Sequence, residues 1–229
     1  MAAEDIFEVM RGQMVAEIVA ETALLAPQLG LDALTGRVIE VMGRVPRHAF
    51  VPADVQPFAY INSPLPIGCG KTISQPFIVA LMTELLDVRS EHLVLEIGTG
   101  FGYQAAILAE LARQVHSVEI IQELAEEGRK RLAGLGYRNI AVRCGNGALG
   151  WPDHAPYDRI MVTAAPDLIP GALLQQLKPG GKMVIPTGIP DQQQLLLVEK
   201  SPQGRISTRE VLAVRFSELE EPADFAGRS

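Results

Sequence analysis

The chain has 229 residues, of which 48% are hydrophobic, and its formal net charge at pH 7 is −7. This length suits one α/β domain, and the hydrophobic content is too high for a disordered chain. The negative charge argues against a protein that binds nucleic acid regardless of sequence, because no basic field would hold the phosphates.

The compartment can be inferred from the cysteines and from the apolar segments. Cys69 and Cys144 show no disulfide or zinc spacing, which favours a reducing environment. The first residues lack the basic and then apolar pattern of a signal peptide, and no apolar run reaches the roughly 20 residues that cross a bilayer. We therefore expect a cytoplasmic protein without a metal, a membrane partner or a nucleic-acid partner.

The first third of the chain is predicted to combine helices with a long loop. Apolar spacing predicts a helix over residues 4–20 and a second helix from about Asp32 to Met42. Residues 57–76 hold several prolines and glycines and are expected to form an ordered loop. A loop of about twenty residues is unusual in a compact domain unless it is functional. A helix over 76–86 should follow, because proline is favoured in a first turn.

From residue 93 onward, strands and helices are predicted to alternate. Strands are expected at 93–97, 115–119, 140–144, 158–163 and 182–186, with helices near 102–112, 122–133 and 170–177. This alternation predicts a doubly wound, mostly parallel α/β sheet with helices on both faces.

The end of the chain is predicted to complete this sheet. Residues 178–181, Lys-Pro-Gly-Gly, are expected to end the last helix. Two further strands, at 194–200 and 206–216, are expected to form a hairpin that gives the sheet a mixed edge. The tail at 217–229 is expected to fray.

The most informative segment is 94–104, which reads Val-Leu-Glu-Ile-Gly-Thr-Gly-Phe-Gly-Tyr-Gln. An apolar run that contains Glu96 is followed by Gly98, Gly100 and Gly102, and a predicted helix begins at once. Glycine permits positive φ and close approach to a ligand, and the start of the helix presents free N–H groups. The pattern indicates a binding site for a nucleotide-like cofactor, although the glycines would also be compatible with a role in packing alone.

A second acid helps to choose between two classes of cofactor. Glu119 ends the next predicted strand about 20 residues beyond the loop, where an acid binds ribose hydroxyls. This spacing fits either a dinucleotide or S-adenosylmethionine. The loop lacks the G-x-G-x-x-G dinucleotide pattern, and a carboxylate at Glu96 would repel a pyrophosphate but suit the amino group of a methionine moiety. We therefore favour S-adenosylmethionine over a nicotinamide cofactor, although Glu96 would also serve as a helix-capping acid and Glu119 as a solvated strand end.

Several motifs together are far more specific than the glycine loop alone. They are Leu-Pro-Ile-Gly-Cys-Gly-Lys-Thr-Ile-Ser-Gln-Pro at 65–76, the glycine loop, Val-Thr-Ala-Ala-Pro at 162–166, Gln-Leu-Lys-Pro-Gly-Gly at 176–181, and Ile-Pro-x-Gly at 185–188. With these motifs the chain resembles the protein-L-isoaspartate O-methyltransferases, a branch of the class I S-adenosylmethionine-dependent methyltransferases, from about residue 45 to residue 216.

The resemblance implies a Rossmann-like, seven-stranded sheet with an N-terminal helical extension. Residues 1–76 would supply helices and a loop that covers the site, and 77–229 would form the cofactor-binding domain, the two together making one compact unit. The implied activity is methylation of the free α-carboxylate of L-isoaspartyl residues in damaged proteins and peptides, as a first step in repair. The resemblance does not give the oligomeric state, for which we favour a monomer.

The resemblance also implies which residues form the site. Ser74 would be catalytic and lie near the acceptor carboxylate, although on spacing alone a helix N-cap is the better interpretation. The implied cofactor-binding residues are Thr72, Ile73, Glu96, Gly98, Thr99, Gly100, Glu119, Asn146 and Gly147.

The chain departs from the family pattern at several positions. Asn146 replaces an acid that contacts adenine, and it would lose a charge-assisted hydrogen bond while keeping an acceptor oxygen. Phe101, Lys71 and Asn62 replace a serine, a glutamine and an acid, and Phe-Ser-Glu-Leu at 216–219 only loosely resembles the family's Phe-Val-Pro-Leu. Lys71 fits either attraction of a substrate carboxylate or a solvated loop charge.

These departures keep two other functions open. One is methylation of ordinary aspartate in a dedicated peptide, and the other is cofactor binding without catalysis. The chemistry of a carboxylate acceptor nevertheless suits the sequence, since a carboxylate is already ionised at neutral pH and needs no general base. The four histidines are scattered and form no triad or metal motif.

Overall fold

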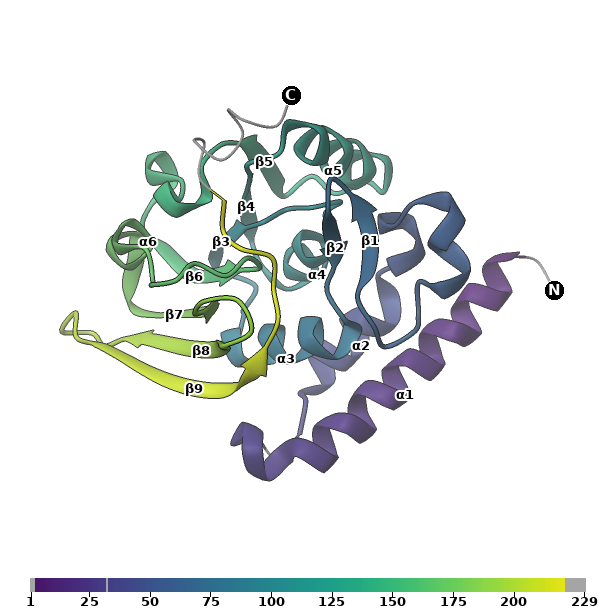
Figure 1. Ribbon diagram of the computed structural model, residues 1–229, viewed down its shortest axis with the longest axis horizontal. Coiled ribbons are helices and arrows are strands. Elements are labelled where there is room, and N and C mark those ends of the chain that lie inside the picture. The colour runs from purple at the N-terminus through teal and green to yellow at the C-terminus, as the bar shows by residue number, and fades with distance from the viewer. Residues whose placement is uncertain (1–2, 32, 221–229) are drawn as a thin grey trace.

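The computed structural model describes residues 3–31 and 33–220, and these contain a seven-stranded sheet with strand order β5-β4-β3-β6-β7-β8-β9 (Figure 1). Neighbouring strands from β5 to β7 are parallel, whereas β8 and β9 are antiparallel to their neighbours. This confirms the predicted doubly wound, mostly parallel sheet. The strands are β3 (Leu93–Ile97), β4 (Gln114–Glu119), β5 (Ile140–Cys144), β6 (Tyr157–Val162), β7 (Leu177–Thr187), β8 (Gln193–Lys200) and β9 (Ile206–Val214).

Helices cover both faces of the sheet, and α1 runs along the outside of α2 and α3 (Figure 1). One hydrophobic cluster includes Met14 and Ile18 of α1, Phe77 of α3 and Val94 of β3, so the N-terminal extension shares its core with the sheet. No described helix is both long enough and apolar enough to cross a membrane. The α-helices are α1 (Ala3–Leu29), α2 (Gly36–Arg44), α3 (Pro76–Leu86), α4 (Tyr103–Leu111), α5 (Gln122–Gly134) and α6 (Gly171–Gln176). The short 3-10 helices are η1 (Arg47–Phe50), η2 (Ala53–Phe58), η3 (Gly147–Leu149) and η4 (Pro152–His154).

Strand β3 and the second half of β6 are largely apolar because helices bury them from both sides. In β3, Val94 and Leu95 are fully buried, as are Ile160, Met161 and Val162 in β6. This composition is typical of parallel strands, which have no solvated face. At the outer edge of the sheet, residues 206–210 of β9 are exposed.

The order of the strands reverses between β3 and β6, and this places the site. The chain moves outward from β3 through β4 to β5 and then returns to the other side of β3 with β6. In open α/β sheets, ligands bind outside the carboxyl ends of the strands at such a switch point. The segments that follow β3, β4 and β6 therefore meet at one edge of the sheet.

The two N-terminal helices differ from their predicted limits. Helix α1 continues to Leu29, well beyond the predicted end at residue 20, because Thr22 and Leu29 still face the core. Helix α2 begins at Gly36, since Thr35 is extended and donates both its N–H and its hydroxyl to Glu84 Oε2, at 2.8 and 3.0 Å. The predicted start at Asp32 lies outside the described residues.

The segment predicted as a long loop contains a β-hairpin. Strand β1 (Leu65–Gly68) pairs antiparallel with β2 (Lys71–Ile73) inside the predicted loop at 57–76. The loop prediction was wrong at this point, because the glycines that suggested irregular structure supply the tight turn. Gly68, Cys69 and Gly70 all have positive φ.

Two predictions for the last third were also wrong in part. Helix α6 ends at Gln176, but residues 178–181 are already part of β7 rather than a stop between elements. The described part of the tail, 217–220, is held by backbone hydrogen bonds to Ala165. The Ala165 N–H donates to Ser217 O at 2.8 Å, and the Leu219 N–H donates to Ala165 O at 2.9 Å. Residues 221–229, on which the rest of that prediction falls, lie outside the described residues.

Substitution of two glycines should separate backbone strain from helix propensity. Gly102 has a φ of +98°, and a Cβ there would lie 2.9 Å from Leu132, so Gly102→Ala should destabilise the protein by about 1–3 kcal/mol. Gly12 lies inside α1, and no described atom comes within 4 Å of the position that an alanine methyl would take there. Gly12→Ala should therefore stabilise the protein by up to about 1 kcal/mol. Urea denaturation of both variants measures the difference, and equal midpoints would contradict the strain at Gly102.

Candidate active site

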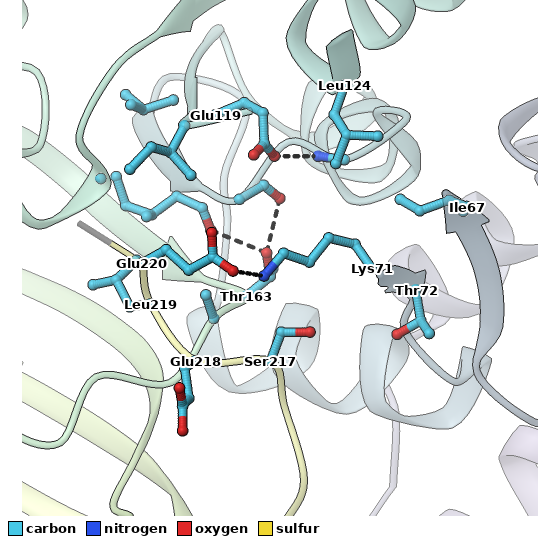
Figure 2. A pocket seen from close by; sticks show the side chains of 17 residues that line it. Ile67, Lys71, Thr72, Glu119, Leu124, Thr163, Ser217, Glu218, Leu219 and Glu220 are labelled. Atoms are coloured by element: carbon cyan, nitrogen blue, oxygen red, sulfur yellow. Dashed lines mark hydrogen bonds and ion pairs between the residues drawn. The ribbon is translucent and has the colours of Figure 1, made fainter. Parts of the chain in front are cut away.

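A cavity opens at the carboxyl ends of β3, β4 and β6, at the switch point of the sheet (Figure 2). Its wall includes the β1–β2 hairpin, the glycine loop after β3, the end of β4 and the beginning of α5. The loop after β6, η3 and residues 217–220 also contribute. We call this space the cofactor cavity.

The glycine loop passes too close to its neighbours to carry side chains. Gly98 and Gly100 have φ values of +93° and +52°. A Cβ at Gly98 would collide with the Thr163 hydroxyl, and one at Gly100 would lie 3.0 Å from Ile67. The positive φ that the sequence predicted for these glycines is present. Both glycines line the cofactor cavity.

Glu119 lies in the cofactor cavity at the end of β4, and backbone groups orient its carboxylate. Its Oε2 accepts from the Gly100 N–H at 2.8 Å, and its Oε1 accepts from the Ile121 N–H at 3.1 Å. Each carboxylate oxygen has two lone pairs, so these bonds leave acceptor capacity on both oxygens. The arrangement can accept two hydroxyl groups from a vicinal diol such as that of a ribose.

Glu96 lies beneath the glycine loop and is not among the described residues that line the cofactor cavity. Its side chain is completely buried, its Oε2 accepts from Ser117 Oγ, and its Oε1 has no described hydrogen-bond partner. Burial raises the pKa of the Glu96 carboxyl to about 8, although the bond from Ser117 opposes this shift. Thr99 is also buried and contacts Ser117, with 2.5 Å between the two hydroxyl oxygens.

The segment after β5 contributes Gly147 to the cofactor cavity, whereas Asn146 lies beside it. Asn146 Oδ1 accepts from the Ala148 N–H at 2.9 Å and caps η3. A Cβ at Gly147 would collide with Ile97. The carboxylate of an aspartate would make the same cap, so this fold tolerates Asn146 in place of an acid.

A second cavity of about 520 Å³ lies between α1, α3 and the end of β9, and we call it the acceptor cleft. Ser74 lines this cleft, and Thr72, Thr163 and Ser217 line both cavities. The two spaces therefore meet at these three residues. Ile73 is buried and borders a smaller cavity between them, which Ser74 also lines.

The structure places beside Ser74 a buried charged residue that the sequence reasoning did not single out. Arg47 is fully buried, and its guanidinium donates to Ser74 O at 2.7 Å and to Ala59 O at 2.8 Å. Burial lowers the pKa of Arg47 to about 10, so it remains charged at neutral pH. Arg47 thus fixes the backbone that carries the Ser74 hydroxyl. The only signal in the sequence was an arginine within the largely apolar segment Val-Pro-Arg-His-Ala-Phe-Val-Pro at 45–52.

Two departures from the family pattern have a structural explanation. Asn62 donates to Glu21 Oε2 at 2.6 Å and accepts from the Phe77 N–H at 3.0 Å, so an acid at 62 would face the Glu21 carboxylate. Phe101 packs under the Arg131 guanidinium, 4.4 Å from the ring centre, and gains a cation–π contact.

Comparison with known proteins agrees with this geometry. The family model for protein-L-isoaspartate(D-aspartate) O-methyltransferase matches residues 29–223. The chain belongs to this family. It is 58% identical to protein-L-isoaspartate O-methyltransferase 1 of Polaromonas sp. strain JS666, over 94% of this chain and 91% of that protein. It is 57% identical to protein-L-isoaspartate O-methyltransferase 2 of Syntrophobacter fumaroxidans, over 95% of this chain and 89% of that protein.

Solved structures of family members share the fold. A protein-L-isoaspartate O-methyltransferase structure superposes with a TM-score of 0.80 at 26% identity, covering 92% of this chain and 66% of that chain. A structure from Plasmodium falciparum in complex with S-adenosyl-L-homocysteine has a TM-score of 0.73 at 21% identity, covering 88% of this chain and 96% of that chain.

The buried Glu96 carboxyl should make stability depend on pH in a specific direction. Because the folded pKa of about 8 exceeds the ordinary value of 4.5, the folded state keeps a proton that the unfolded chain releases. The contribution of Glu96 to wild-type stability should therefore fall as pH rises from 4.5 to 8. Glu96→Gln mimics the protonated acid and should gain stability relative to wild type across this window, with the difference levelling off above pH 8. Urea denaturation at pH 5, 6.5 and 8 measures the difference in unfolding free energy between Glu96→Gln and wild type. A difference that does not change with pH would contradict a buried, protonated Glu96.

Proposed function

We propose that this protein transfers a methyl group from S-adenosylmethionine to the free α-carboxylate of L-isoaspartyl residues in damaged proteins and peptides. The observation that carries the proposal is that the cofactor cavity and the acceptor cleft meet at Thr72, Thr163 and Ser217, while no histidine is among the described residues that line either space. A carboxylate acceptor needs no general base, whereas an amine or phenol would usually need one. Relatives at 55–58% identity that carry the name protein-L-isoaspartate O-methyltransferase support the same activity.

The residues of the cofactor cavity fit the proposed cofactor. Glu119 would accept the ribose hydroxyls, and the backbone at Gly98 and Gly100 would border the cofactor. Gly147 and Leu124 would border the adenine. When bound, the cofactor supplies a methyl group on a positively charged sulfur.

The remaining predicted cofactor residues are proposed to act around the cavity. Thr72 and Ile73 would cover the cofactor from the β1–β2 hairpin. Glu96 and Thr99 would support the glycine loop from below through Ser117, instead of meeting the methionine amino group.

Ser74 is the proposed catalytic residue in the acceptor cleft. Its hydroxyl would donate to one oxygen of the acceptor carboxylate while the other oxygen attacks the methyl carbon, and the bond from that carbon to sulfur breaks. The acceptor is ionised beforehand, so no proton has to be removed by the protein. Arg47 would contribute by holding the Ser74 backbone in place.

We further propose that the protein acts as a cytoplasmic monomer and that residues 1–76 and 77–229 work as one unit. The hydrophobic cluster shared by α1, α3 and β3 supports the single unit. Cys69 and Cys144 are exposed free thiols, which suits a reducing compartment.

Methyl transfer from labelled S-adenosylmethionine to an isoaspartyl peptide, with the aspartyl peptide as control, tests the proposed activity. We expect base-labile label on the isoaspartyl peptide alone. Label on both peptides would favour a carboxyl methyltransferase for ordinary aspartate. No label on either peptide, with the cofactor bound, would favour a homologue that binds the cofactor without catalysis.

Substitution of Ser74 should affect the acceptor and spare the cofactor. Ser74→Ala should lower kcat/KM for the isoaspartyl peptide by about 10- to 100-fold, because a hydrogen bond to a charged group is lost. The affinity for S-adenosylmethionine, measured by calorimetry, should change by less than about twofold. Ser90→Ala, at an exposed serine away from both cavities, is the matched control. Unchanged kcat/KM in Ser74→Ala would remove Ser74 from the mechanism.

A further inference from the structure

An ion pair joins two distant parts of the chain at the cofactor cavity. Lys71 Nζ lies 2.8 Å from Glu220 Oε1, and both residues line the cavity. Their side chains are 20% and 13% exposed, which makes this pair less solvated than a typical surface salt bridge. Figure 2 shows Lys71 reaching across the cavity from the β1–β2 hairpin to Glu220.

Both partners are attached to well-defined backbone. Lys71 begins β2, which pairs with β1. Glu220 follows Leu219, whose N–H donates to Ala165 O at 2.9 Å. The β1–β2 hairpin therefore holds the Lys71 charge at the cavity, and the segment bonded to Ala165 holds the Glu220 charge there.

The other carboxylates near the cavity are bonded to backbone groups, buried, or directed away from Lys71. Glu119 accepts from two backbone N–H groups, and Glu96 is buried beneath the glycine loop. Glu218 is exposed, and its carboxylate points away from Lys71 in Figure 2. Among the described residues that line the cavity, Lys71 carries the only cationic side chain.

We propose that Lys71 and Glu220 bind the amino-acid end of the cofactor, with Lys71 taking its carboxylate and Glu220 its ammonium group. This inference rests on the proposed function, because it requires S-adenosylmethionine in the cofactor cavity. An ion pair is complementary to a zwitterion, since each charge of the ligand meets an opposite charge and the four charges sum to zero. A lysine ammonium has three N–H donors, so Lys71 can contact Glu220 and a ligand carboxylate together. Such charge-assisted bonds are stronger than neutral ones.

Two ligands with a thioether sulfur can show whether the Lys71–Glu220 pair binds the amino-acid end of the cofactor or only closes the cavity. S-adenosylhomocysteine carries the amino-acid end, whereas 5′-methylthioadenosine keeps the adenosine and the sulfur but lacks that end. Calorimetric titration of both ligands would be performed on wild type, Lys71→Gln and Glu220→Gln. Lys182→Gln is the matched control, because Lys182 pairs with Glu199 at 3.5 Å outside the cavity.

We expect Lys71→Gln and Glu220→Gln each to weaken S-adenosylhomocysteine binding by about tenfold, while 5′-methylthioadenosine binding changes by less than about twofold. Lys182→Gln should leave both affinities unchanged. Equal weakening of both ligands would show that the pair only closes the cavity and would overturn the proposal. Tighter or unchanged S-adenosylhomocysteine binding in Lys71→Gln would overturn it as well.

The same titration separates this inference from the proposed function. If wild type binds neither ligand, the proposed function fails together with the inference. If wild type binds S-adenosylhomocysteine and Lys71→Gln binds it equally well, only the role of the ion pair fails. A thermal unfolding scan of each variant confirms that a lost affinity does not reflect a lost fold.

Discussion

The site depends on a close contact between two neighbouring strands at the switch point of the sheet. The Thr163 hydroxyl shares its hydrogen between Ile97 O at 3.0 Å and Gly98 O at 2.8 Å. This contact joins the end of β6 to the end of β3 and leaves no space for a side chain at Gly98. The chain after β3 must therefore turn with a positive φ, and that turn directs the Gly100 N–H toward Glu119. The position of the Glu119 carboxylate therefore depends on this packing constraint as well as on the nearby Ile121 N–H.

The same constraint explains why two nearby acids have different chemistry. Glu96 lies within β3, where both faces of the strand are covered, and its pKa is raised to about 8 by burial. Glu119 lies at the last position of β4, where the strand ends and backbone N–H groups become available. One acid is thus buried beneath the glycine loop, and the other lines the cofactor cavity. Strand position, rather than residue type, decides the role.

Much of the sheet could be predicted from the sequence, because buried parallel strands are short apolar runs separated by helical spacing. Strands β3 and β5 begin and end where the sequence indicated. The β1–β2 hairpin was missed, since its prolines and glycines signal irregular backbone and only the pairing of Leu65 with Ile73 reveals a strand. The order within segment 217–220 was missed for a similar reason, because it arises from backbone bonds to Ala165 that no local pattern encodes.

In the site, too, some features follow from local sequence patterns and others only from tertiary contacts. Glycine spacing and the acid at 119 were sufficient to locate the cavity, because both follow from the geometry of a strand that turns into a helix. The burial of Glu96 could not be read from its position in the motif, since the side of the strand that faces the ligand depends on the loop that follows. The Lys71–Glu220 pair joins residues that are 149 positions apart, a contact that depends on tertiary structure.

That sequence separation has a consequence for biosynthesis. The wall of the cofactor cavity draws on the hairpin near residue 70, the loops after β3, β4 and β6, and residues 217–220. Domains fold as units during synthesis, and contacts between distant residues form only when both have left the ribosome. A nascent chain that lacks residues 217–220 has an incomplete cavity, however much of the sheet has already formed. The ability to bind a small molecule in this cavity is thus acquired only after residues 217–220 have left the ribosome, and a ligand that binds there would report on their arrival in the fold.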